Sequence, residues 1–344
     1  MAPPVHQLSW PLLKAVSRSF YWTLRVLPRP VRPQIALAYL LARTTDTIAD
    51  TNLVPLERRL EALQQLRKRI LGTSQSPLEF NDLAGRQGSA PEKLLLESTE
   101  ANLQMLQRFS GVDQSHIRQV LDTITGGQEL DLRRFAGASA NNIVPLKTEE
   151  ELDDYTFRVA GCVGEFWTLV CRGHLFPQAN LDDTQLVKDG IRFGKGLQLV
   201  NILRDLPADL RQGRCYLPAN KMAEARIAPA DLLNPATEPR IRPIYDLWIE
   251  RATAHLRAGW AYTNTLPRNC FRVRLACAWP ILIGMETLAL LRTQNVLEPE
   301  RRIKVDRRKV KKLMLRSILL YPRPAAWQRL IPARESIASK AILA

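Results

Sequence analysis

The chain has 344 residues and carries 49 Lys and Arg against 34 Asp and Glu, a formal net charge of +15. Hydrophobic residues make up 46% and charged residues 24%, which excludes a disordered or low-complexity chain. The 16 glycines are fewer than the 23 prolines, which argues against a loop-rich β protein and favours helices. The length suits one large domain or two ordinary ones, and of these we expect a single all-α domain over residues 1–344, with a basic segment over about 300–344.

The five cysteines and four histidines indicate neither a disulfide framework nor a zinc site, because no Cys-x-x-Cys pair occurs and the histidines are dispersed. The N-terminus has no basic region followed by an apolar run, so it does not resemble a signal peptide. These features predict a reduced, cytoplasmic protein that is not secreted. The positive charge indicates an anionic partner: nucleic acid, an anionic membrane surface or a phosphorylated substrate.

The periodicity of apolar residues predicts helices along most of the chain. In chain order they cover residues 12–27, 34–49, 56–71, 92–109, 114–135, 151–175, 183–206, 244–265 and 270–293. Residues 74–91 are polar and bounded by Pro and Gly, which predicts a surface loop. Pro207 either kinks or ends the helix before it, and a Pro-rich connection follows up to Pro243. The sequence shows no run of alternating strands.

Two segments near the C-terminus combine apolar and basic residues. Residues 275–291 are the most apolar in the chain, but they contain Pro280 and Glu286, so we predict a buried core helix rather than a membrane span. Residues 300–312 are densely basic and precede an apolar stretch at 313–321. This basic segment is either a solvated helix face or a patch that holds phosphates or anionic lipid head groups.

Two pairs of aspartates stand four residues apart, Asp46 with Asp50 and Asp205 with Asp209. On a helix this spacing places both carboxylates of a pair on one face, where like charges repel. Mg²⁺ would offset that repulsion, because it takes one or two carboxylates and completes its shell with water and phosphate oxygens. One such pair arises by chance in a chain of this length, so each pair alone is weak evidence.

Polar neighbours strengthen both pairs. Arg43 stands three residues before the first pair, on the same helix face. Gln198 and Asn201 continue the second pair into one polar stripe on an otherwise apolar helix, with Arg204 beside it. Such a stripe faces either solvent or a polar cavity, and its composition fits a cavity that holds phosphate and metal.

A third patch combines a tyrosine with small residues in a helical pattern. Tyr155 is followed by Ala160, Gly161 and Gly164, although glycine disfavours a helix by about 1 kcal/mol per residue. The small residues indicate either close helix packing or a passage for a long apolar chain. In the second case Tyr155 would stand at the mouth of the passage as a hydrogen-bond donor or proton carrier.

Taken together, four motifs resemble the squalene/phytoene synthase family of head-to-head prenyl diphosphate synthases. The motifs are Ser-Arg-Ser-Phe at 17–20, Tyr39-x-x-x-Arg43-x-x-Asp46-x-x-x-Asp50, Tyr155-x-x-x-Val-Ala-Gly-x-Val-Gly164, and Gln198-x-x-Asn201-x-x-Arg204-Asp205-x-x-x-Asp209 followed by Arg214. The resemblance extends from about Ser17 to about Lys312, and the order and spacing of the four motifs are far more specific than either acidic pair. Two of these segments, Asp-Thr-Ile-Ala-Asp and Ser-Arg-Ser-Phe, are more similar to the corresponding motifs of squalene synthases than to those of phytoene synthases.

The resemblance implies an all-α isoprenoid (prenyl) synthase fold with a central cavity, and farnesyl diphosphate as substrate. It implies that Asp46, Asp50, Asp205 and Asp209 hold Mg²⁺ ions that bridge to the substrate diphosphate and make it a better leaving group. Two farnesyl diphosphates would condense to presqualene diphosphate, and reduction by NADPH would then give squalene.

The same resemblance implies roles for further residues. Tyr155, assisted by Tyr39, would handle the proton or steady a cation, as aromatic faces can. The implied substrate-binding residues are Ser17, Arg18, Ser19, Phe20, Arg43, Gln198, Asn201, Arg204 and Arg214. The implied cofactor-binding residues are Arg18, Arg43, Arg204 and Lys304.

The chain departs from the family pattern at two places. Squalene synthases commonly carry a further acid where this chain has Ala49. Lys304 matches the first residue of a Lys-x-Arg that serves the NADPH phosphate in the family, but Asp306 replaces its arginine. Arg307 or Arg308 could substitute for that arginine.

Two kinds of alternative stay open. The same chemistry could give phytoene or dehydrosqualene, or stop at presqualene diphosphate, because cavity depth sets substrate length. A remote alternative is a non-catalytic basic helical protein that binds nucleic acid or membrane. We expect an enzyme without a nucleic-acid partner, since the charge is spread along the chain and no nucleic-acid motif occurs. We also expect a monomer that lacks the C-terminal anchor of eukaryotic relatives and whose basic tail touches anionic membrane.

Overall fold

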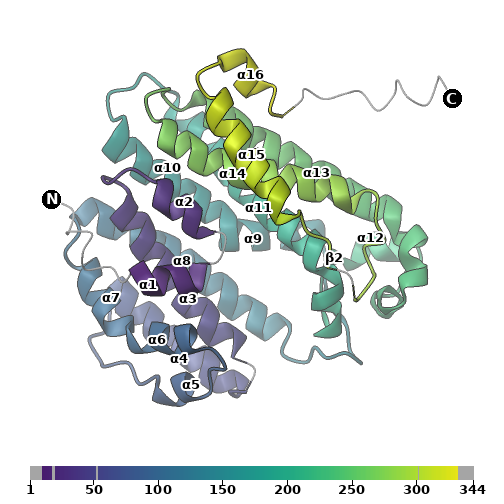
Figure 1. Cartoon of the computed structure of the whole chain (residues 1–344). Coiled ribbons are helices and arrows are strands. Elements are labelled where there is room, and N and C mark those ends of the chain that lie inside the picture. Colours follow the sequence, from purple (N-terminus) through teal and green to yellow (C-terminus); the bar gives the residue numbers. More distant parts are fainter. Residues whose placement is uncertain (1–9, 18–19, 52, 301, 332–344) are drawn as a thin grey trace.

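The computed structural model describes residues 10–17, 20–51, 53–300 and 302–331, which form a helical bundle with one small sheet (Figure 1). This confirms the predicted all-α fold. The longer helices are α3 (Arg32–Asp50), α4 (Leu56–Leu71), α8 (Gly111–Arg134), α10 (Cys162–Leu175), α11 (Asp183–Arg211), α13 (Glu238–Thr265), α14 (Phe271–Leu291) and α15 (Arg307–Leu320). The shorter ones are α1 (Trp10–Ser17), α2 (Phe20–Val26), α5 (Asn81–Gly85), α6 (Ala90–Glu97), α7 (Thr99–Leu106), α9 (Glu149–Thr156), η2 (Phe157–Gly161), α12 (Ala219–Glu224), η3 (Pro229–Leu233), η4 (Pro235–Thr237) and α16 (Pro324–Gln328).

Two groups of helices make up the bundle. In one group α3, α4 and α8 pack against one another, and in the other α11 packs against α10, α13 and α14. Helix α8 also contacts α10 and thereby joins the groups, while α15 lies on α14 at the outside of the molecule (Figure 1). The buried apolar side chains form one continuous core. The helices that carry the two acidic pairs, α3 and α11, therefore belong to different groups.

Glycines allow the backbones of α10 and α11 to approach closely. A β-carbon at Gly164 would lie 1.9 Å from the carbonyl oxygen of Gly190, and one at Gly194 would lie 2.0 Å from that of Ala160. Neither position accepts a larger residue unless the helices move apart. Of the two interpretations of these small residues, close helix packing agrees with the structure.

The sheet consists of two short strands, β1 (Val144–Leu146) and β2 (Arg214–Pro218), which pair in parallel. Neither strand is predicted from the sequence, because runs this short show no alternating pattern. Between α11 and β2 stands Gly213, which has a φ of +80° and whose missing side chain makes room for the backbone of Ser139. This turn places Arg214 directly beyond the end of α11.

Several predicted boundaries are wrong. Residues 92–109 were expected to form one helix, but they contribute to α6 and α7. The predicted helix 12–27 contributes to α1 and α2, and residues 18–19 between them lie outside the described part of the chain. The predicted loop 74–91 contains α5, and the Pro-rich connection contains α12, η3 and η4. Helix α13 begins at Glu238, earlier than predicted. Pro239 stands in its first turn, where the missing N–H needs no partner.

Pro207 lies inside α11, which continues beyond it to Arg211. The helix therefore does not end at this proline, a point that the sequence leaves open. As a consequence Asp205 and Asp209 lie on one continuous helix, one turn apart.

Helix α14 is, within the described residues, the one helix that is long and apolar enough to cross a membrane by length and composition. In its most apolar window 67% is buried inside the protein. The helix packs against α2, α11, α13 and α15, which cover its apolar surface. This arrangement agrees with the prediction of a core helix over residues 275–291.

Candidate active site

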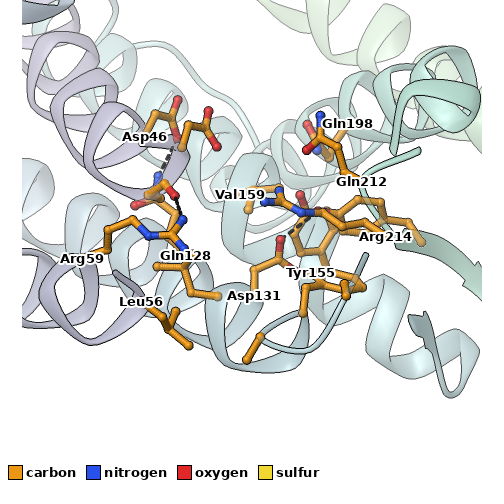
Figure 2. Close-up of a pocket in the computed structure, with 17 residues that line it drawn as sticks. Asp46, Leu56, Arg59, Gln128, Asp131, Tyr155, Val159, Gln198, Gln212 and Arg214 are labelled. Atoms are coloured by element: carbon orange, nitrogen blue, oxygen red, sulfur yellow. Dashed lines mark hydrogen bonds between the residues drawn. The ribbon is translucent and has the colours of Figure 1, made fainter. Parts of the chain in front are cut away.

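A cavity of about 580 Å³ opens where the two groups of helices meet (Figure 2). Its lining comes from α3, α4, α8, α9, η2, α11 and β2, together with the segments that follow α8 and α11. The lining residues are Asp46, Ala49, Asp50, Leu56, Arg59, Gln128, Asp131, Leu132, Phe135, Ala136, Ala138, Tyr155, Val159, Gln198, Gln212, Arg214 and Tyr216. The cavity thus combines acids, arginines and amides with an aromatic and aliphatic portion.

The first acidic pair forms one wall of this cavity. Asp46 and Asp50 extend from the last two turns of α3. The Asp46 side chain is 50% exposed to the cavity, and its Oδ1 accepts a 2.5 Å hydrogen bond from Gln128 of α8 (Figure 2). Arg43 lies 3.8 Å from the Asp46 carboxylate, but its closer partner is Glu92, at 2.6 Å.

The second acidic pair lies beside the cavity on α11 and is not among its lining residues. Two arginines hold Asp205: Arg204 Nε donates to it at 2.9 Å and Arg302 Nη2 at 3.0 Å. Asp209, by contrast, has no side-chain hydrogen bond or ion pair within the part of the chain that the structure describes. The carboxylate of Asp209 therefore has more acceptor capacity left for a ligand than that of Asp205.

Arg214 and Asp131 lie within electrostatic reach of both acidic pairs. Both side chains line the cavity, from β2 and from α8 (Figure 2). Burial raises the pKa of Asp50, Asp131 and Asp209, and the positive charge of Arg214 opposes the shift in all three. A fixed guanidinium that acts on both pairs at once is well placed to contact an anionic group held between them.

Two tyrosines stack at the cavity. The rings of Tyr155 and Tyr216 have their centroids 4.6 Å apart, and Phe135 packs edge-on against Tyr216 at 5.3 Å. The Tyr216 hydroxyl donates to Asp131 Oδ2 at 2.7 Å. Burial raises the pKa of both tyrosines, so both phenols are protonated near neutral pH. An aromatic surface thus borders the charged portion of the cavity.

The pKa values of the aspartates in both acidic pairs are shifted from the ordinary value. Burial raises the pKa of Asp46 to about 6 and that of Asp209 to about 7, and the second acid of each pair adds to the shift. Burial would also raise the pKa of Asp205, but its two arginine partners outweigh this effect and lower it. Carboxyl groups whose ionised form is disfavoured in this way gain stability from a bound cation.

A sequence model for squalene/phytoene synthases matches residues 13–309. The chain belongs to the squalene/phytoene synthase family. It is 30% identical over 259 residues to presqualene diphosphate synthase of Rhodopseudomonas palustris, covering 74% of this chain and 77% of that one. It is 25% identical over 320 residues to squalene synthase of Schizosaccharomyces pombe, covering 90% of this chain and 64% of that one.

Other curated relatives in the family are bifunctional lycopene cyclase/phytoene synthases, of which the chain spans less than half the length. The solved ligand complex of TcSQS with E5700 superposes with a TM-score of 0.72 at 21% identity, covering 93% of each chain. That likeness shows that the fold is shared. Family membership makes the protein a prenyltransferase of isoprenoid biosynthesis.

Members of the squalene/phytoene synthase family generally use Mg²⁺, and the donor set of this chain fits that ion. Among the described residues no three His, Cys, Asp or Glu gather closely enough to hold a metal ion alone. Mg²⁺ does not require such a group, since one or two carboxylates, water and substrate phosphates complete its shell. Asp46 and Asp50 face the cavity as a pair of this kind.

Mg²⁺ binding is expected to strengthen as the pH rises from about 5 to about 8. Asp46 and Asp209, with pKa values raised to about 6 and about 7, must lose their protons before they bind a cation. With inorganic diphosphate present, calorimetry should show the dissociation constant of Mg²⁺ falling at least about tenfold over this range. Because diphosphate itself titrates, Asp209→Asn is the control, and its pH slope should be smaller. An equal slope in that variant would exclude Asp209 as a ligand.

Some residues implied by the resemblance do not reach the cavity. Tyr39 stacks on Phe20 with ring centroids 5.1 Å apart, and its hydroxyl donates to a carbonyl of α1 at 3.2 Å. Ser17 is buried, and its hydroxyl has no hydrogen-bond partner among the described residues. Arg18 and Ser19 lie outside the described residues.

Other implied residues lie along α11. Gln198 lines the cavity, whereas Asn201 is exposed and its amide lies 3.4 Å from that of Gln198. Arg204 is paired with its neighbour Asp205. The polar stripe predicted from the sequence therefore reaches the cavity at Gln198 and continues beside it toward Asp209.

Six polar or aromatic lining residues are not predicted from the sequence: Arg59, Gln128, Asp131, Phe135, Gln212 and Tyr216. Gln128 and Asp131 belong to no motif quoted above, although they are polar residues on the inner side of a long helix, which is an available signal. Tyr216 comes from a strand that is too short to recognise. These residues enlarge the candidate site of this squalene/phytoene synthase family member beyond its motifs.

Proposed function

We propose that the protein is a squalene synthase, which condenses two farnesyl diphosphates to presqualene diphosphate and reduces this intermediate with NADPH to squalene. The observation that carries the proposal is the position of one acidic pair, from α3, in the wall of a cavity that also holds an arginine and an aromatic surface, with the second pair, from α11, beside it. The motif that begins at Asp46 supports this product, because it is more similar to squalene synthases than to phytoene synthases.

In this proposal Asp46, Asp50, Asp205 and Asp209 hold Mg²⁺. The bound ions would neutralise the departing diphosphate. Arg214 contributes a fixed positive charge between the pairs, where the diphosphate oxygens gain charge as the C–O bond breaks. Gln198 would donate hydrogen bonds to the same oxygens, since its amide lines the cavity.

The proposed condensation places positive charge on carbon. When the C–O bond of one farnesyl diphosphate breaks, the electron pair leaves with the diphosphate and an allylic cation remains. The double bond of the second substrate forms the new C–C bond, and a proton, which the Tyr155 phenol would relay to the released diphosphate, is lost as the cyclopropane ring closes. The stacked rings of Tyr155 and Tyr216 offer an aromatic face to that cation, a contact worth about 2 kcal/mol when desolvated.

Tyr155→Phe is expected to slow condensation by about 10²–10⁴-fold. The substitution removes the phenol that would take part in proton transfer but keeps the ring that stacks on Tyr216. Single-turnover consumption of farnesyl diphosphate measures the effect. The dissociation constant of inorganic diphosphate, measured in parallel, should stay unchanged. An unchanged rate of consumption would mean that the Tyr155 phenol takes no part in the reaction and that the residue contributes by packing alone.

The proposed reduction requires a site for the NADPH phosphate. Lys304 is exposed in the segment before α15, and Asp306 accepts a hydrogen bond from the backbone N–H of Arg308 as the N-cap of that helix. The acid that replaces the arginine of the family thus begins α15, and it brings the exposed Arg307 and Arg308 next to Lys304. In this proposal those three bases hold the phosphate by charge.

A presqualene diphosphate synthase is the second candidate. The replacement of the family arginine by Asp306 favours it, because this exchange removes a cofactor contact. The 30% identity to presqualene diphosphate synthase of Rhodopseudomonas palustris also supports it.

Product analysis separates these functions. Purified protein is incubated with farnesyl diphosphate and Mg²⁺, with and without NADPH, and the products are identified by mass spectrometry. Squalene formed only with NADPH would support the squalene synthase, whereas presqualene diphosphate under both conditions would support the second candidate. Dehydrosqualene under both conditions would contradict both, and unconsumed farnesyl diphosphate would contradict the substrate.

A further inference from the structure

Helix α15 lies on α14 with its orientation fixed (Figure 1). Near its C-terminal end Ser317 is buried and accepts a 3.0 Å hydrogen bond from Trp279 of α14. Near its N-terminal end Lys309 pairs with Glu286 of α14 at 2.5 Å. Because both ends are attached, one side of α15 faces the core and the opposite side faces outward.

The outward side of α15 combines exposed aliphatic side chains with positive charge. Leu315, Ile318 and Leu319 are 58%, 46% and 65% exposed. The exposed bases on the same side of the helix are Lys311, Lys312 and Arg316. Spacings of three and four residues place both sets on this side of the helix. Most of the bases lie toward its N-terminal end, and the aliphatic residues lie toward its C-terminal end. Helix α15 contains no acidic residue.

An aromatic residue extends the apolar end of this surface. Phe271, the first residue of α14, is 48% exposed, and its ring lies 6.2 Å from that of Tyr321, which follows α15. We call the outward side of α15 together with Phe271 the docking face. Its apolar part therefore spans two helices.

We propose that the docking face binds the surface of an anionic lipid bilayer. Helices that lie in the membrane interface carry apolar residues that enter the head-group boundary and bases that contact anionic lipid. Leu315 and Leu319 would enter the boundary, while the long stems of Lys311 and Lys312 keep their charges at the level of the head groups. The proposal goes beyond the reaction, because it assigns a surface outside the cavity.

Other occupants fit the docking face less well. A second copy of the chain would bring two sets of bases together without an acid of α15 to pair with them, and like charges across an interface repel. A nucleic acid would pair with the bases through its phosphates but leave the exposed leucines in water. An anionic bilayer takes up both the charges and the aliphatic side chains.

The test measures partition of the full chain, without substrate, onto phosphatidylcholine vesicles with and without phosphatidylglycerol. We expect binding to the anionic vesicles that weakens as salt is added. The double substitution Leu315→Gln and Leu319→Gln should weaken that binding at least about tenfold. Leu247→Gln is the matched control, since Leu247 on α13 is 63% exposed, and it should bind as the unsubstituted chain does.

A second pair of variants tests the charge. Lys311→Glu should weaken binding about tenfold, whereas Lys188→Glu, at an exposed position of α11, should change it less than about twofold. All substituted side chains are exposed, so the unfolding temperature should not change. Because no substrate is present, these results are independent of the proposed reaction.

Three outcomes would overturn the proposal. The first is that the chain does not bind anionic vesicles. The second is that the double leucine variant binds as tightly as the Leu247→Gln control, which would leave charge alone as the cause. The third is a dimer in size-exclusion chromatography that Leu319→Gln dissociates, which would assign the docking face to a second copy.

Discussion

Asp209→Asn is expected to lower the rate of farnesyl diphosphate consumption at least about 1000-fold. An amide is a poorer ligand for Mg²⁺ than a carboxylate, and Asp209 is the acid of the α11 pair whose side chain has no hydrogen bond or ion pair among the described residues. The rate is measured as diphosphate released in a single turnover. Turnover within about threefold of the unsubstituted enzyme would remove Asp209 from the proposed metal site.

The same substitution should not weaken the fold, which separates a functional from a structural effect. Burial and the charge of Asp205 raise the pKa of Asp209 to about 7, so the ionised carboxylate costs folding free energy. That cost begins near the ordinary pKa of about 4, grows with pH and is complete above about 7. In Mg²⁺-free buffer Asp209→Asn should therefore unfold at the same or a higher temperature at about pH 8, and the difference should vanish toward about pH 4.

Gly164→Ala is expected to lower the free energy of unfolding by about 3 kcal/mol. The added methyl group would lie 1.9 Å from the carbonyl oxygen of Gly190, so α10 and α11 must separate to admit it. Urea denaturation followed by circular dichroism measures the loss. Activity should fall as well, because α11 carries Gln198 and Asp209.

Gly173→Ala is the matched control on the same helix. Gly173 lies in α10, and a β-carbon there would meet nothing within 4 Å. Alanine at this position should raise the free energy of unfolding by about 0.5–1 kcal/mol, since glycine costs a helix that much. A similar loss in both variants would mean that a cause other than the contact with Gly190 sets the effect, since helix propensity alone favours alanine.

Long helices could be predicted from the sequence because their signals are local. The predicted helix 56–71 agrees with α4 at both ends: Pro55 precedes it, and Gly72, with a φ of +78°, ends it. The helices of both acidic pairs were likewise expected, since apolar periodicity extends through them. The predicted boundaries were wrong where a helix is short, as in α5, or begins with prolines, as in α13.

The candidate site was only partly predictable, because its assembly depends on contacts between distant segments. The motifs indicate the acidic pairs and Tyr155, whose residue types carry chemistry at a fixed spacing. Asp131 and Tyr216 stand outside any motif and meet only in the folded chain, through a 2.7 Å hydrogen bond. Tyr39 was expected to assist Tyr155, but its position is set by packing against Phe20, which spacing within a motif does not reveal.

The distribution of the lining residues along the chain has a consequence during synthesis. The first acidic pair is on α3, while the second is on α11, whose buried side needs α13 and α14. A chain emerging from the ribosome folds its N-terminal helices first, and these can pack α3, α4 and α8 against one another before α11 has been made. We expect such an incomplete chain to be inert toward prenyl diphosphates rather than partly active. A nascent molecule would therefore gain its chemistry only when most of its length has been made.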